Sequence, residues 1–187
     1  MRRRFSRRVQ VPADVLARAE LRRSGKVLAG CRSDDGTWLL GSRDALLIVR
    51  PAADPVVGPD PVVGPVATRI PWERVASADW SSDDDRLQIV EVVDFGRPRV
   101  VHAFDLDDPG TLLPFLRERV TASIVLQRRI VVRARQGLTV IARRPPGGAG
   151  QIGWACELDA GLDPDDPEVR ALADAGLRAA AEELGQA

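Results

Sequence analysis

Short apolar runs separated by turn-forming residues constrain what this chain can fold into more than any other feature of its sequence. Six such runs lie in the first 104 residues, at 26–32, 37–42, 44–50, 68–80, 86–93 and 97–104. Asp35-Gly36 stands between the first two, and this dipeptide favours a hairpin because a tight turn needs positive φ angles. The glycine-containing segment 94–97 joins the last two runs. The pattern predicts six or seven strands connected by turns.

The hydrophobic period changes on both sides of this region. Residues 12–25 predict a short helix that begins at Pro12 and ends near Gly25. Residues 107–126 predict a second helix, capped by Asp108 with Pro109 in its first turn. Its apolar face has helical spacing and consists of Leu112, Leu113, Leu116, Val120 and Ile124.

Three further strands and a last helix are expected after residue 126. The strands are predicted at 128–135, 138–144 and 151–159. The helix is predicted from Pro167 to Leu184, because Asp165 and Glu168 have the spacing of a capping box. Its inner stripe consists of Val169, Leu172, Ala173, Gly176, Ala180 and Leu184. The order of helix, strands, helix, three strands and helix predicts an α+β protein.

A duplicated hexapeptide, DPVVGPDPVVGP, occupies residues 54–65. Two copies of six residues are too few for a solenoid, in which each repeat has about 20 residues or more. Proline and glycine also suit a central strand poorly. We interpret the segment as a duplicated loop inserted between two strands.

Several of these runs resemble a known bacterial fold. The residues that carry the likeness are KVLAG, DALLIVR, TRIPWERVASADW and LLPFLRERVTASIVL. They resemble pleckstrin-homology-like (PH-like) domains, in which a helix closes bent antiparallel sheets. The whole chain is similar to uncharacterised proteins of high-GC bacteria that combine RERVTASIV with a helix beginning DPDDPEVRA. The resemblance implies a basic arm at 1–12, a PH-like domain at 13–126 with a loop insertion at 51–67, and a β-β-β-α extension at 127–187.

Charge and composition limit the classes of partner. The formal net charge is +0, which argues against a protein that coats nucleic acid, although five arginines lie in the first eight residues. Asp34 and Asp35 stand in the first hairpin loop, where PH-like phosphoinositide binders carry basic residues, so this route to lipid is disfavoured. No apolar run has the length of a membrane span. Two cysteines without metal spacing suit a reducing compartment, and we expect a cytoplasmic protein.

The residues that often carry chemistry have no visible partners. His102, the one histidine, lies in a strand without a recognisable nucleophile or orienting carboxylate, and Cys31 and Cys156 are expected to be small buried side chains. GAGQIG at 148–153 matches a dinucleotide-binding motif, but a strand follows it where that motif needs a helix. We therefore assign no catalytic, cofactor or metal residue. An enzyme that uses scattered carboxylates stays open as an alternative.

The strongest functional signal is a group of arginines in the first two strands after residue 126. Strand alternation places Arg129, Arg133 and Arg135 on one face, and Arg143 and Arg144 end the neighbouring strand. These five form the candidate interaction surface, because guanidinium groups bind carboxylates and phosphates. A face paired with the chain's own acids and a weak nucleic-acid surface are the alternatives. We expect a non-enzymatic interaction or scaffolding module for an acidic protein partner.

Overall fold

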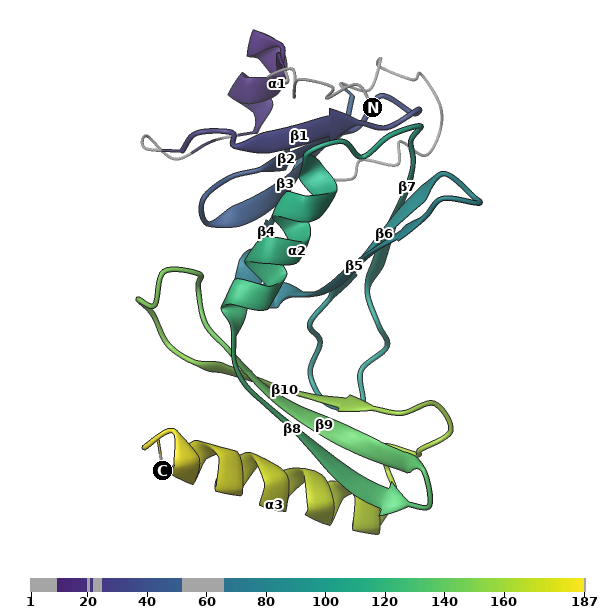
Figure 1. The fold of residues 1–187 in the computed structure, drawn as a ribbon, viewed down its shortest axis with the longest axis vertical. Coiled ribbons are helices and arrows are strands. Elements are labelled where there is room, and N and C mark those ends of the chain that lie inside the picture. The colour runs from purple at the N-terminus through teal and green to yellow at the C-terminus, as the bar shows by residue number, and fades with distance from the viewer. Residues whose placement is uncertain (1–9, 20, 22–24, 52–65, 187) are drawn as a thin grey trace, which may run out of the picture.

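The computed structural model describes residues 10–19, 21, 25–51 and 66–186, and within these it is an α+β protein with three antiparallel sheets (Figure 1). The predicted α+β class and the predicted order of elements are confirmed. The duplicated hexapeptide and most of the arginine-rich N-terminus lie outside the described residues. No helix in the described part is long and apolar enough to cross a membrane.

The first sheet is a four-stranded meander. It contains β1 (Ala29–Arg32), β2 (Trp38–Gly41), β3 (Ala45–Val49) and β4 (Ala67–Pro71) in that order. The turn between β1 and β2 is the one expected from Asp35-Gly36: Gly36 has φ 85°, and the Asp35 carboxylate accepts hydrogen bonds from Ser33 and Thr37. The helix α1 (Ala13–Arg18) packs Val15 against the outer face of this sheet. It starts after Pro12 as predicted but is shorter, with Ala19 at its C-cap.

The second sheet contains β5 (Val75–Ser81), β6 (Arg86–Glu91) and β7 (Val101–Asp105). The run 68–80 is divided between the two sheets by the 3-10 helix η1 (Trp72–Arg74). This division buries Trp72 completely between the sheets. The connection between β6 and β7 is longer than the expected turn at 94–97, although that turn forms and Gly96 has φ 75°.

The helix α2 (Leu112–Ser123) lies between these two sheets (Figure 1). Leu112 and Leu116 are fully buried in the main core. The prediction that Asp108 caps this helix is wrong: α2 begins four residues later, and Asp108 instead accepts a hydrogen bond from the N–H of Gly110 in the preceding turn. The expected inner residue Ile124 also lies outside the helix and is the first residue of β8.

The third sheet and the last helix form the C-terminal part. The sheet has the order β10 (Gly153–Leu158), β9 (Gln136–Arg143) and β8 (Ile124–Arg133), and α3 (Pro167–Glu183) covers one of its faces (Figure 1). The cap of α3 is Asp166, not the predicted Asp165, and its carboxylate accepts from the N–H of Glu168. Residues 148–153 enter β10 from a loop, as expected. The expected domain boundary at residue 126 falls inside β8.

Candidate functional site

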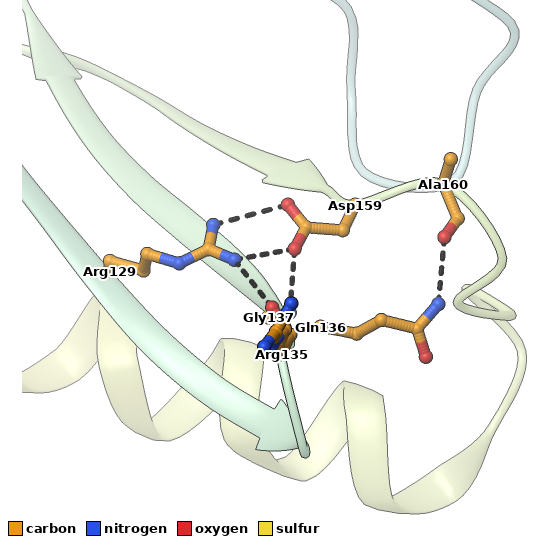
Figure 2. Close-up of polar contacts among 6 residues, drawn as sticks. All are labelled: Arg129, Arg135, Gln136, Gly137, Asp159 and Ala160. Carbon is orange, nitrogen blue, oxygen red and sulfur yellow. Dashed lines mark hydrogen bonds and ion pairs between the residues drawn. The ribbon is translucent and has the colours of Figure 1, made fainter.

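Arg129, from the predicted arginine surface, is tied to the segment after β10. Its guanidinium donates to both carboxylate oxygens of Asp159, at 3.1 and 2.5 Å, and to the carbonyl oxygen of Arg135 at 3.2 Å. The N–H of Gly137 donates to the same carboxylate at 2.9 Å, and Gln136 donates to the carbonyl of Ala160 (Figure 2). The tip of the β8–β9 hairpin is thereby bonded to the chain that leads from β10 to α3.

The helix α3 is held at both ends by other arginines of β8. Arg133 donates to the carboxylates of Asp166 and Glu168 at 2.5 and 3.1 Å, at the start of the helix. Arg128 pairs with Glu183 in its last turn. Two of the predicted surface arginines, Arg129 and Arg133, are therefore neutralised within the chain. This was the alternative in which the arginine face pairs with the chain's own acids.

The remaining three arginines do not complete one exposed surface. Arg143 is 3% exposed and donates to Ser123, Val120 and Ala76, so its assignment to an interaction surface is corrected to an internal one. Alternation could have indicated this, because Arg143 shares a strand face with the buried Ile141. Arg135 is exposed at the hairpin tip, and Arg144 is half-buried at the opposite end of β9.

The acids of this network are stabilised in their charged form. The hydrogen bond from Arg129 and the N–H of Gly137 lower the pKa of Asp159. The N–H of Glu168 and the guanidinium of Arg133 likewise lower the pKa of Asp166, against the opposing effect of burial. A carboxylate with a lowered pKa adds stability above its ordinary pKa and loses it as the pH falls through its folded value.

We expect Asp159→Asn to lower stability at pH 7 and to have a progressively smaller effect below about pH 4. The variant removes the charge that Arg129 binds, whereas wild-type Asp159 becomes neutral only in acid. Thermal melts of both proteins between pH 2.5 and 7 measure this. Asp83→Asn, at an exposed aspartate in the β5–β6 turn, is the matched control and should match wild type. An Asp159→Asn difference that does not vary with pH would contradict the assignment.

A second candidate site is a cavity of about 270 Å³ at the junction of the second and third sheets. On one side it is lined by four consecutive residues of β10, Ala155 to Leu158. On the other side are the start of β5, the end of β6 and the segment that follows β6. Ligand sites are often found at such junctions between structural units.

The rim of the cavity carries charges of both signs. Asp94, Arg97, Arg99 and Glu157 line it and are exposed, and none of them forms a salt bridge with another residue that the structure describes. The wall contains apolar side chains, among them Val90 and Val92. This arrangement differs from the arginine hairpin, where the acids already form salt bridges with Arg129 and Arg133.

His102 has a carboxylate partner that the sequence did not reveal. Its Nε2 lies 2.6 Å from Oε1 of Glu91, and both side chains are mostly buried. The signal is the register of β6 and β7: His102 pairs with Ile89, so Glu91 is its diagonal neighbour on the same face. Glu91 lines the cavity and His102 does not. The pair fixes the orientation of Glu91.

Comparison with known proteins adds no relative to this picture. No protein-family model, curated protein or solved structure matches the chain. Function is therefore inferred from the two sites alone. Within the described residues, no group of three or more His, Cys, Asp and Glu side chains could hold a metal ion.

The two cysteines are both shielded thiols. Burial raises the pKa of Cys31 to about 12, and burial with the nearby charges of Glu157 and Asp174 raises that of Cys156 to about 11. Cysteine reactivity follows the thiolate fraction. Neither group is therefore activated as a nucleophile at neutral pH.

We expect iodoacetamide at pH 8 to alkylate Cys156 about 100-fold more slowly in the folded protein than in urea, because its pKa is about two units higher. Mass spectrometry of tryptic peptides over time gives both rates. Cys31 should react more slowly still. Rapid alkylation of Cys156 in the native protein would indicate an activated thiol and would favour the enzyme alternative.

Proposed function

We propose that this protein is a non-enzymatic interaction module, in which a PH-like β domain carries a β-β-β-α extension and a partner protein binds at the junction of the two. The PH-like assignment is supported by the strand order: a four-stranded meander is followed by a three-stranded meander and then by α2. α2 contacts η1, β1, β2 and β5, which suits a helix that closes two sheets.

One observation carries the choice of site. The junction cavity combines an apolar wall with four rim charges that have no salt-bridge partner in the described part of the chain. Binding can pair such charges at little cost, because no internal ion pair has to be broken first. In the arginine hairpin, by contrast, an acidic partner must compete with Asp159, Asp166 and Glu168. The same competition disfavours a nucleic-acid surface there.

Site-specific photocrosslinking tests this proposal. The photoreactive amino acid p-benzoylphenylalanine is placed at Val93 in the cavity, at Arg135 on the hairpin tip, and at the exposed Leu28 directly before β1. In extract of the native cells, we expect a discrete crosslinked product from Val93 alone. Filling the cavity by Ser77→Trp should abolish that product while the melting temperature shows an intact fold.

Two outcomes would overturn the proposal. A product from Arg135 and none from Val93 would return the interaction to the arginine hairpin. Equal products from all three positions, insensitive to Ser77→Trp, would show nonspecific contact.

A further inference from the structure

Among the strands that the structure describes, β10 is paired along one edge and open along the other. It is the outer strand of its sheet and pairs with β9 in an unbroken register. The N–H of Asp159 donates to the carbonyl of Gly137 at 3.0 Å, which fixes the direction of the backbone groups along the strand. In an antiparallel ladder, alternate residues direct their N–H and C=O groups to the same neighbour. Glu157 therefore bonds to β9, whereas the backbone groups of Cys156 and Leu158 point to the open edge.

This open edge faces the junction cavity. Four consecutive residues of β10 line the cavity, and residues that belong to both faces of a strand do so when the cavity lies against the strand's edge. The connection after β6 crosses the same edge. Its Val92 packs with Ala155 on one face of the sheet, whereas Phe95 belongs to the cluster beneath α3 on the other face. The cavity is the space between β10 and this connection.

We propose that an extended peptide segment of a partner protein binds in this cavity as an added strand, which pairs with the backbone of Cys156 and Leu158. This inference rests on the junction as the partner site and names the form of the partner. Cys156 and Leu158 lie two positions apart, which is the spacing at which an added strand forms hydrogen bonds with the backbone of an edge strand. The lining part of β10 accommodates about 10–13 Å of extended chain, which is three or four residues.

The chemistry of the cavity favours a peptide over other occupants. Side chains that alternate along an added strand would meet the apolar wall on one side and the charged rim on the other. Charges of both signs at Asp94, Glu157, Arg97 and Arg99 suit a peptide with mixed charge. A polyanion would meet the carboxylates of Glu91, Asp94 and Glu157 at this site. Open strand edges are commonly blocked by charge, bulges or covering segments. Here the connection after β6 crosses the edge of β10, and the cavity lies between the two.

The probe is a phage-displayed library of random ten-residue peptides, with synthetic copies of the peptides that it selects. We expect selected peptides to bind wild-type protein and to lose binding to the Ser77→Trp variant. Each peptide is then N-methylated at one residue at a time, and affinities are measured by calorimetry. Methylation at two positions separated by one residue should lower affinity about tenfold each, and methylation between them should have little effect, because only alternate N–H groups bond to β10.

A pair of protein variants tests the same geometry from the other side. Cys156→Pro removes the outward N–H and keeps the bonds to β9, and edge strands tolerate proline at such positions. It should weaken binding about tenfold, whereas Cys156→Ala, which removes only the thiol, should not. If Cys156→Pro does not fold, the methylation pattern alone decides.

Uniform tolerance of N-methylation overturns the strand model, and so does a library without any peptide sensitive to Ser77→Trp. If Val93 still crosslinks to a partner in that case, the junction remains the partner site and only the form of its occupant is wrong. If no selected peptide is sensitive to Ser77→Trp and Val93 does not crosslink to a partner, the proposed function is wrong as well.

Discussion

Replacing Trp72 with alanine is expected to lower the free energy of unfolding by about 3–5 kcal/mol, the range for deletion of a large aromatic side chain from a core. Trp72 is fully buried between the first two sheets. Its ring meets Phe115 of α2 edge to face, with centroids 5.7 Å apart, and its Nε1 donates to the carbonyl of Ser42 at 3.1 Å. The substitution removes the contact between the Trp72 ring and α2 and leaves a cavity in the core between the sheets.

Trp72→Phe is the matched control for this prediction. It keeps an aromatic ring against Phe115 and removes the hydrogen bond to Ser42, so it should cost clearly less than the alanine variant. Urea unfolding followed by circular dichroism measures both. If Trp72→Ala lowers the free energy of unfolding by less than about 1 kcal/mol, Trp72 does not hold the two sheets together, because changes this small are typical of surface positions.

Local patterns were sufficient to predict most of the elements. The β1–β2 turn follows from Asp35-Gly36, and the amphipathic period of α3 gives its buried residues Val169, Ala173 and Ala180. The 3-10 helix at Trp72 could not be predicted in this way, because apolar residues are mixed with polar and charged ones along the run 68–80 and only packing decides where it changes sheet. The predicted cap of α3 was off by one residue, because Asp165 and Asp166 are adjacent and either could take this role, and the predicted cap of α2 was off by three, since its N-cap is Thr111 and not Asp108.

The candidate sites depend on contacts that are distant in sequence. Arg129 and Asp159 are 30 residues apart, and Arg133 and Asp166 are 33 apart. Sequence alternation identified the arginines but not the acids that neutralise them. The junction cavity is formed by segments from three strands and a connection, and its residues Arg97, Arg99 and Glu157 have no distinctive local pattern. Such a site appears only when the third sheet is placed against the second.

Arg143→Ala is expected to lower the free energy of unfolding by about 2–4 kcal/mol, because it leaves buried acceptors without a donor. The Arg143 guanidinium donates to Ser123 Oγ at 2.9 Å and to the carbonyl of Ala76 at 3.0 Å. It thereby joins β9 to the end of α2 and to the start of β5. Burial lowers the pKa of Arg143, which is the expected response of a cation withdrawn from water.

The loss should be local to the junction, and this separates Arg143 from an ordinary core residue. Ala76 lines the cavity, so releasing its carbonyl should loosen the β5 side of the proposed partner site. Hydrogen exchange should therefore rise more at residues 76–77 and at the end of α2 than in α3. Arg144→Ala, at the half-buried neighbour whose guanidinium does not take part in this network, is the control and should leave both exchange and stability near wild type. Equal effects of the two alanine variants would show that the guanidinium of Arg143 does not couple the two parts. If Arg143→Ala also weakens the Val93 crosslink, the internal arginine supports binding by holding the cavity in shape, which is a different role from direct contact with a partner.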